Sequence, residues 1–468
     1  MQLKVTVQMP QKTLSEWLSL LEVNHPTEIE FGLNRIARVA MKLGFSSSEI
    51  DKLANSNIKE ENRLHGGDSS KIGVKHLVSP AKKIIMVGGT NGKGSCVAIL
   101  DGILRAAGHK VGTYTSPHLI RYNERISING CHATDAEICS AFEEIELARG
   151  PISLSYFEFS TLAALLIMAS EKLDFAILEV GLGGRLDAIN FMDPCMSIIT
   201  SIALDHQDWL GHDLDGIGAE KAGIGRKGIP LIYGDMQPIQ GVLDTAGSLQ
   251  VKLLINGQDF SFEQFGVPAP AFLPAASVAC GLQAAVLLDP SLSSSLLEEA
   301  LSLVRLDGRY QRLCVDGVNI ILDVAHNPQA SELLSKRLAH SAKGRIVAIA
   351  GMMSDKDILG ILEPMIPIVD TWYFCDIPGN SRASRARNAA SIYNDHLQAR
   401  ICKQMHRNHS KPGGSLDVGS EKIEVFERES SEKAIKEAIS NAKPADTVVV
   451  FGSFVVVGSV LNWLKNIN

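Results

Sequence analysis

The chain has 468 residues, so a typical domain size of about 100–200 residues predicts two to four domains. Hydrophobic residues make up 45% and charged residues 21%, a globular composition that excludes a disordered or fibrous chain. The 45 basic and 52 acidic side chains leave a formal charge of −7, and aromatic residues are only 6%. Neither value favours a nucleic-acid partner, which needs basic surfaces or stacking platforms.

The sequence also argues against a membrane or secreted protein. No apolar run reaches the roughly 18–20 residues that a membrane span needs, and the first residues show no signal-peptide pattern. The eight cysteines include no Cys-x-x-Cys pair. We therefore expect a reduced, cytoplasmic protein, monomeric by default, with no membrane partner, zinc site or disulfide framework.

Short apolar runs alternate with amphipathic stretches along most of the chain. Buried strands are expected at 83–87, 174–180, 196–202, 229–233, 318–324, 345–350, 371–375 and 446–451. Helical patterns are expected between them, at 95–107, 161–172, 296–304 and 431–442. This alternation predicts an α/β fold with a mostly parallel sheet.

Two polar segments interrupt the pattern, at 46–79 and 405–420, and both are expected to be surface loops or insertions. A third break falls at Leu306-Asp307-Gly308. We place the domain boundary there, with an N-terminal domain over 1–306 and a smaller C-terminal domain over 307–468.

The strongest local signal lies between the first buried strand and the helix that follows it. Glycines there let backbone N–H groups face an anion, and a helix N-terminus adds a favourable dipole. The candidate phosphate-binding residues are Thr90, Asn91, Gly92, Lys93, Gly94 and Ser95. The match to a general phosphate loop is imperfect, because Val87 stands at the first glycine position and the hydroxyl comes one residue late.

Several further motifs occur in a fixed order with this loop. They are Tyr114–Leu119, Arg121–Arg125, Ser155–Glu158, Leu178–Ala188, Leu204–Gly211, Glu220–Ile224, Gly308–Tyr310, Asp323–Pro328 and Gly351–Asp357. The set resembles the bifunctional dihydrofolate synthase/folylpolyglutamate synthases of the Mur ligase superfamily. The resemblance implies an N-terminal P-loop-type ATPase domain with a mostly parallel sheet and a smaller, Rossmann-like α/β C-terminal domain.

The resemblance also implies a reaction. An ATP-dependent amide ligase would add L-glutamate to dihydropteroate and to reduced folates such as tetrahydrofolate, through an acyl phosphate. ATP and one or two Mg²⁺ ions would be required, because charge neutralisation supplies much of the catalysis of phosphoryl transfer.

Residue roles follow from the same resemblance. Lys93, His206 and Lys221 are the expected catalytic residues, and Arg309 and Asp323 are expected on ATP. The expected metal ligands are Ser116, Glu179, His206 and Lys221, the last as a possible carbamate. The expected pterin-binding residues are Arg121, Ser155, Tyr156, Phe157, Glu158, Leu186, Asp187 and Ala188. His326 and Arg382 are candidates for the incoming glutamate.

The chain departs from the family at one ATP contact, and other functions stay open. The family's Asn-Ala-Ala before the linker is replaced by 274–279, which contains no Asn, so Ser277 substitutes or the contact is missing. The alternatives are a folylpolyglutamate synthase only, a Mur-type ligase for a peptidoglycan precursor, and a non-catalytic ATP-binding module that regulates a partner.

Overall fold

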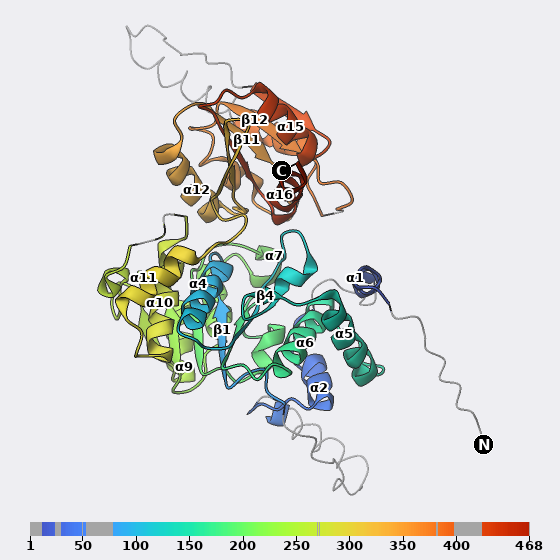
Figure 1. Ribbon diagram of the computed structural model, residues 1–468, viewed down its shortest axis with the longest axis vertical. Helices are drawn as coiled ribbons and strands as arrows, with labels where there is room; N and C mark the ends of the chain where they lie inside the picture. The colour runs from blue at the N-terminus through green and yellow to red at the C-terminus, as the bar shows by residue number, and fades with distance from the viewer. Residues whose placement is uncertain are drawn as a thin grey trace, which may run out of the picture. The chain divides into compact units, whose positions relative to one another are not determined.

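The computed structural model describes residues 12–23, 30–48, 50–52, 78–268, 270, 272–380, 382–396 and 424–467 (Figure 1). Within these residues the chain divides into two compact units. The first unit comprises the described residues of 12–202 and 210–304, and the second comprises those of 203–209 and 305–467. The short segment Ala203–Trp209 therefore belongs with the C-terminal residues.

The first unit is built on an eight-stranded sheet in the order β4-β3-β2-β5-β1-β6-β7-β8. The six strands from β2 to β8 in this order are parallel, whereas β3 and β4 add an antiparallel edge. The strands are β1 (Lys83–Gly88), β2 (Val111–Tyr114), β3 (Ile126–Ile128), β4 (Cys131–His132), β5 (Phe175–Glu179), β6 (Met196–Ile199), β7 (Pro230–Tyr233) and β8 (Lys252–Ile255).

Helices cover both faces of this sheet (Figure 1). They are α1 (Leu14–Val23), α2 (Asn34–Leu43), α4 (Lys93–Ala106), α5 (Asp135–Arg149), α6 (Tyr156–Ala169), α8 (Leu214–Ala222), α9 (Gln240–Leu249), α10 (Ala275–Leu288) and α11 (Ser294–Leu303). Short helices add η1 (Tyr122–Arg125), η2 (Ala188–Phe191) and η3 (Phe262–Phe265), and α7 (Gln207–Leu210) ends at the junction of the two units.

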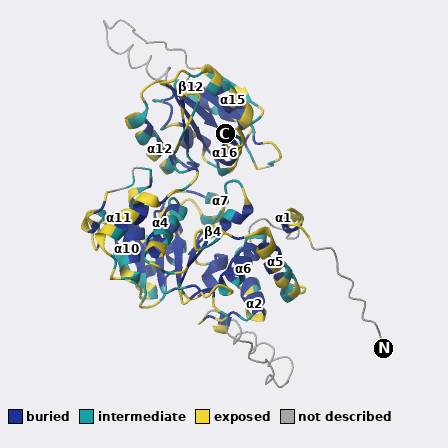
Figure 2. Cartoon of the chain, viewed as in Figure 1, coloured by how far each residue is buried: buried dark blue, intermediate teal, exposed yellow. Residues whose placement is uncertain are grey.

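Alternate residues of β1 show how the two faces are packed. Ile85 and Val87 join the core formed with α4, α10 and α11, whereas Ile84 and Met86 join the core formed with α1, α2, α5 and α6. Both cores are buried in Figure 2. A strand covered on both faces reads as a continuous apolar run, which is why these strands could be found in the sequence.

The second unit carries a six-stranded sheet in the order β13-β12-β11-β14-β10-β9, parallel except for β9. Its strands are β9 (Gln311–Val315), β10 (Val318–Leu322), β11 (Ile346–Ala350), β12 (Thr371–Cys375), β13 (Glu424–Arg428) and β14 (Thr447–Phe451). Its helices are α12 (Pro328–Ser341), α13 (Ile358–Leu362), a helix at 386–396, α15 (Ser431–Asn441) and α16 (Phe454–Ile467).

The α/β prediction is confirmed, and each of the eight expected strands is present to within a few residues. The sequence missed β2, β3, β4, β8, β9 and β13, which are short or partly exposed. The segment 46–79 was expected to be a polar loop, but its described ends are ordered. Ser47 and Ile50 are buried, and Phe45 forms a β-bridge with Val78. Residues 53–77 and the predicted insertion at 405–420 lie outside the described residues.

Among the described helices, none is both long and apolar enough to cross a membrane. The seven cysteines in the described part of the chain are free thiols.

Candidate functional site

The carboxyl ends of four neighbouring strands bring the sequence-predicted residues of the first unit to one sheet edge. Register pairs Val87 of β1 with Glu179 of β5, and Tyr114 of β2 with Leu178 of β5. The phosphate loop that follows β1, Ser116 after β2 and Glu179 therefore share this edge. In open parallel sheets, ligands bind outside the carboxyl ends of the strands.

The phosphate loop is held by the two residues that follow the next strand, β6. The N–H of Thr90 donates to the carbonyl of Ser201 at 2.7 Å, and the Thr200 hydroxyl donates to the carbonyl of Asn91 at 2.7 Å. The Ser201 hydroxyl lies 3.2 Å from the N–H of Asn91 and 3.1 Å from its carbonyl. The loop is thus fixed in shape by backbone and hydroxyl contacts before any ligand is considered.

Two glycines of the loop sit where a side chain would not fit. Gly89 has φ +135°, and a Cβ there would lie 2.1 Å from Thr200 Oγ1. Gly92 has φ +83°, and a Cβ there would lie 2.2 Å from Ser277 Oγ. Ser277 also donates to the Gly92 carbonyl at 3.0 Å. At the start of α10, where the family's Asn is absent, Ser277 therefore supports the phosphate loop itself.

The loop carries a polar atom that suits a phosphate or a metal ion. Ser95 is fully buried, and its hydroxyl has no hydrogen-bond partner among the described residues. A buried hydroxyl without a partner is costly unless a ligand completes it. Lys93, at the first turn of α4, directs its amine toward the Gly89 and Thr90 carbonyls at 3.2 and 3.3 Å. The residues present fit a nucleotide phosphate with a divalent cation.

Two charged side chains are buried near this loop. Glu179 ends β5 and is 4% exposed. Lys221, near the end of α8, is 5% exposed and donates to the Gly89 carbonyl at 3.2 Å. The carbamate on Lys221 stays a prediction, which intact-protein mass spectrometry would test. Across the described residues no group of three His, Cys, Asp or Glu side chains could hold a metal ion.

Ser155 and Glu158 form the N-terminal cap of α6. The Glu158 carboxylate accepts the Ser155 N–H at 2.8 Å, and the Ser155 hydroxyl accepts the Glu158 N–H at 3.3 Å. Arg35 of α2 reaches the buried Glu158 at 3.2 Å. Burial raises the pKa of Glu158, although these hydrogen bonds and Arg35 oppose that rise. These two predicted substrate residues therefore use their polar groups to position the first turn of α6.

That first turn presents two aromatic rings. Phe157 stacks on Tyr114, with ring centroids 5.9 Å apart, and it covers Gly181 so closely that a Cβ there would lie 2.4 Å from the ring. Tyr156 meets Tyr122 edge to face at 6.1 Å. A flat apolar surface of this kind suits an aromatic ligand.

The loop after β5 turns back through Asp187, which is buried. Its carboxylate accepts the N–H groups of Gly181, Leu182 and Ile189 at 3.0, 2.9 and 3.0 Å. Burial raises the pKa of Asp187 to about 6, although those N–H groups and the charge of Lys93 oppose the rise. Leu186 and Ala188 flank it, and Ala188 begins η2. Asp187 is therefore a buried carboxyl whose pKa lies well above that of an exposed aspartate.

The two arginines of the Arg121–Arg125 motif, which contains η1, differ in their exposure and in their contacts. Arg121 is 70% exposed and lies 3.7 Å from Asp135. Arg125 is 8% exposed, and its Nε donates to His118 Nδ1 at 2.9 Å. Burial and the nearby Arg125 charge lower the pKa of His118 to about 4, so the ring is neutral at pH 7 and can accept this bond.

The second unit gathers several predicted residues around Asp205. Lys356 pairs with Asp205 at 2.5 Å, His326 Nε2 lies 3.6 Å away, and Asn327 donates at 3.2 Å. Burial alone would raise the pKa of Asp205, but the hydrogen bond with His326 and the charges of His206 and Lys356 hold it well below its usual range. His206 follows directly, with φ 50°.

Arg309 and Asp323 also lie in this unit. The Arg309 guanidinium lies over the Phe454 ring at 5.0 Å. Both Asp323 oxygens accept backbone N–H groups, from Tyr310 and Ala325 at 2.9 Å each. Burial raises the pKa of Asp323 against the charge of Arg309. Asp323 thus fixes the turn that carries Arg309.

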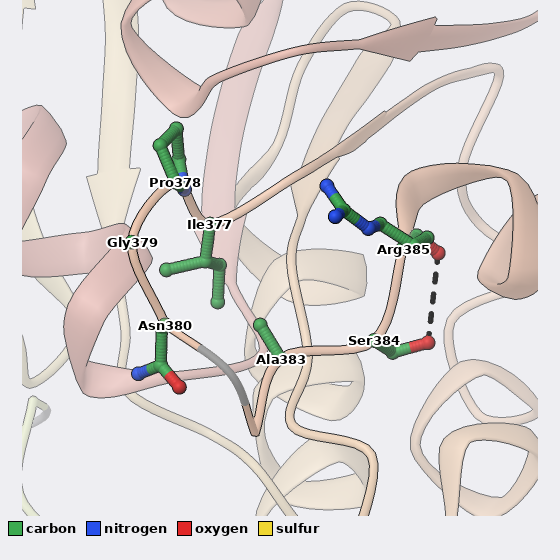
Figure 3. A pocket seen from close by; sticks show the side chains of 7 residues that line it. All are labelled: Ile377, Pro378, Gly379, Asn380, Ala383, Ser384 and Arg385. Carbon is green, nitrogen blue, oxygen red and sulfur yellow. Dashed lines mark hydrogen bonds between the residues drawn. The ribbon is translucent and has the colours of Figure 1, made fainter.

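A pocket of about 330 Å³ opens after β12, between residues 377 and 385 (Figure 3). Arg382 belongs to the same loop but does not line the pocket. Its guanidinium lies 3.5 Å from Asp355, and its backbone carbonyl accepts the Ser354 N–H. The candidate glutamate residue is therefore already engaged with a carboxylate.

Comparisons with known proteins identify the family of the chain. Residues 308–454 match the family model "Mur ligase, glutamate ligase domain". The chain is 35% identical over 463 residues to the dihydrofolate synthase/folylpolyglutamate synthase of Escherichia coli K12, covering 96% of this chain and 94% of that protein. It belongs to the dihydrofolate synthase/folylpolyglutamate synthase family.

Other relatives extend the match over the whole chain. The Haemophilus influenzae enzyme of the same name is 34% identical, covering 97% of each chain. Escherichia coli FolC in complex with DHPP and ADP superposes with a TM-score of 0.81 at 34% identity, covering 98% of this chain and 99% of that one. The Yersinia pestis bifunctional enzyme with AMPPNP and Mn ion gives a TM-score of 0.80 at 36% identity, covering 98% and 100%.

The structure brings together most, but not all, of the residues expected from the family motifs. The first unit contains the phosphate loop, Ser116, Glu179, Lys221 and the aromatic residues Tyr156 and Phe157. The second unit contains His206, Arg309, Asp323, His326 and Arg382. Sequence reasoning missed Thr200, Ser201 and Lys356, and it placed the pterin near the segment Arg121–Arg125 without singling out Arg125. Arg125 and Lys356 lie inside quoted motifs, but only burial distinguishes them from neighbouring charges.

Replacing Gly89 with Ala should weaken nucleotide binding by at least about tenfold, because the new Cβ collides with Thr200 Oγ1 and the φ of +135° disfavours a side chain. Titration with ADP by calorimetry measures the effect. The control is Gly247→Ala, where the Cβ meets open space. Equal ADP affinity in the two variants would show that the phosphate loop tolerates displacement.

Replacing Lys356 with Met should destabilise the second unit by about 3 kcal/mol, since it leaves Asp205 buried with one cation fewer. The matched control is Lys336→Met on α12, whose exposed pair with Glu332 should contribute under about 1 kcal/mol. Urea unfolding followed by tryptophan fluorescence, to which the buried Trp372 of the second unit contributes, compares them. Equal midpoints would contradict a structural role for the Asp205–Lys356 pair.

Proposed function

We propose that this chain is an ATP-dependent amide ligase that joins L-glutamate to dihydropteroate and to reduced folates, using Mg²⁺. The observation that carries the proposal is the anchored phosphate loop with its buried, unpartnered Ser95 hydroxyl, at the same sheet edge as Glu179. Family membership supports the substrate class. The relatives whose names or structures mention folate synthesis, DHPP, ADP and Mn support an acceptor, a nucleotide and a divalent ion.

In this account the acceptor carboxylate attacks the γ-phosphorus of ATP, and ADP leaves. The glutamate amine then attacks the acyl carbon of the resulting acyl phosphate, phosphate leaves, and the amine loses a proton. The N–H groups at the start of α4 and the amine of Lys93 hold the phosphates in line for the first step. Magnesium supplies charge neutralisation when bound, with Ser116, Glu179 and Lys221 in the first unit and His206 in the second as proposed ligands.

The residues proposed to bind the acceptor substrate have different roles. Phe157 and Tyr156 offer aromatic faces to the ring system, and Asp187 offers an ionised carboxylate to pterin N–H donors. Ser155 and Glu158 keep the first turn of α6 in place through its cap. His326 and Arg382 are proposed to face the incoming glutamate, and Arg309 and Asp323 the nucleotide.

Phosphate release tests the function directly. The protein is given ATP, Mg²⁺ and L-glutamate with dihydropteroate in one tube and tetrahydrofolate in another, and glutamate is omitted as the control. Release with both acceptors is expected. Release with tetrahydrofolate alone would reduce the activity to folylpolyglutamate synthesis. Release only with a UDP-muramoyl acceptor, or with none, would overturn the proposal in favour of a Mur-type ligase or a regulatory module.

Acceptor use should depend on the ionisation of Asp187. Its pKa of about 6 means that the carboxyl takes up a proton as the pH falls through 6, and then accepts pterin N–H groups poorly. The kcat/KM for dihydropteroate should therefore fall below pH 6, since kcat/KM reports the free enzyme. In Asp187→Asn that fall should disappear, with a lower kcat/KM at pH 8. An unchanged pH profile in the variant would contradict the role of Asp187.

A further inference from the structure

Arg125 is a buried cation without an anionic partner in the described part of the chain. It is 8% exposed, and its side-chain contacts with described residues are the Nε bond to His118 and the faces of Tyr122 and Tyr156, whose ring centroids each lie 5.4 Å from the guanidinium carbon. None of these groups carries a negative charge at neutral pH. A buried charge normally requires a paired charge, because desolvation is costly.

Other arginines of the first unit show the usual solution. Arg35 pairs with Glu158, Arg149 with Glu146 and Arg185 with Glu220. These arginines are all more exposed than Arg125, at 22–58% of their side-chain surface. The most deeply buried of the four is thus the one that lacks a carboxylate.

The acidic side chains next to Arg125 in sequence are already used. The Glu124 carboxylate accepts the N–H groups of Leu119, Ile120 and Arg121 at 2.7, 3.0 and 2.7 Å. Asp135 accepts from Asn123 at 2.8 Å and lies near the exposed Arg121. Glu124 therefore holds the turn together. The two terminal nitrogens of Arg125 are left to donate hydrogen bonds to another group.

The surroundings of Arg125 indicate which group accepts hydrogen bonds from these two nitrogens. Through His118 it contacts the segment that follows Ser116 after β2, the proposed metal-binding end of the site. Through Tyr156 it contacts the first turn of α6, the proposed acceptor pocket. The ligand group that lies where the acceptor pocket meets the metal-binding end is the carboxylate that reacts.

We propose that Arg125 binds the reacting carboxylate of the acceptor through its terminal guanidinium nitrogens. In dihydropteroate this group is the benzoate carboxylate, and in a reduced folate it is the terminal glutamyl carboxylate. A guanidinium presents a planar pair of donors that matches a carboxylate, and its aromatic neighbours keep the plane fixed. This inference rests on the proposed function, since it names a contact of the same substrate.

The test separates the carboxylate from the rest of the ligand. Binding of dihydropteroate and of its carboxamide, in which an uncharged amide replaces the carboxylate, is measured by fluorescence titration without ATP. The variants are Arg125→Met, Arg125→Lys, Arg121→Met and, as a matched control, Arg105→Met, whose arginine pairs with Asp101 on α4. Thermal melting confirms that each variant is folded.

The unaltered protein should prefer dihydropteroate over the carboxamide by about 10- to 100-fold, the range for a charged hydrogen bond. Arg125→Met should abolish this preference while carboxamide binding changes less than about threefold. Arg125→Lys should keep part of it, and Arg105→Met all of it. If Arg125→Met fails to fold, a full preference in Arg125→Lys overturns the inference, because a lysine does not reproduce the paired donors.

Two further outcomes would overturn the inference. In the first, Arg125→Met weakens the binding of both ligands equally, which would make Arg125 a structural residue. In the second, Arg121→Met abolishes the preference for dihydropteroate instead. Failure of the unaltered protein to bind either ligand would overturn the proposed function, and the inference with it. The results with the unaltered protein therefore distinguish a wrong function from a wrong residue.

Discussion

The phosphate loop between β1 and α4 is held in shape by Thr200 and Ser201, and the proposed chemistry depends on that support. Parallel pairing of β1 with β5 and β6 fixes where these strands end, so the loop, Glu179 and the Thr200–Ser201 pair meet at one edge. Hydrogen bonds from Thr200 and Ser201 then set the backbone of Thr90 and Asn91. A loop shaped in advance needs little rearrangement when an anion binds, which is the basis of electrostatic preorganisation.

The charged groups of the first unit fall into two kinds. Glu158 and Asp187 are buried carboxyls that accept hydrogen bonds from helix caps, backbone N–H groups and, for Glu158, Arg35, and the Asp187 carboxylate keeps an acceptor site for the proposed pterin contact. They hold α6 and the loop after β5 in position. Ser95 and Arg125 are different. The buried Ser95 hydroxyl has no partner among the described residues, and the Arg125 guanidinium forms no ion pair there beyond its Nε hydrogen bond to His118. The first kind supports the site, and the second kind marks where ligands are expected.

The sequence predicted the parallel α/β fold because buried strands are continuous apolar runs, as in β1, β5 and β11. It missed β3 and β4, which are only three and two residues long. It also missed β13, which has no fully buried residue and no strict alternation of buried and exposed positions. The phosphate loop could be predicted because glycines, a lysine and a following helix are local signals. Ordered contacts at Ser47 and Ile50 escaped prediction, because their burial depends on packing against distant residues such as Phe191.

Motif resemblance suggested the acceptor-binding residues but did not separate the roles of their side chains. Arg121 and Arg125 stand in one motif, and no local pattern separates an exposed arginine from a buried one four residues later. Likewise Ser155 and Glu158 match a substrate motif and an S-x-x-E capping box at the same time. Only the three-dimensional structure shows that their polar groups are used on the helix, leaving the aromatic rings of Tyr156 and Phe157 for a ligand.

The central claim is that the acceptor carboxylate itself is phosphorylated by ATP. The most direct measurement uses dihydropteroate labelled with ¹⁸O in both carboxylate oxygens, with ATP, Mg²⁺ and L-glutamate, and determines the label in the released phosphate by mass spectrometry. The account predicts that one ¹⁸O atom appears in phosphate for each amide formed. Unlabelled phosphate formed alongside the amide would contradict it, because the carboxylate oxygen would then not have passed through an acyl phosphate.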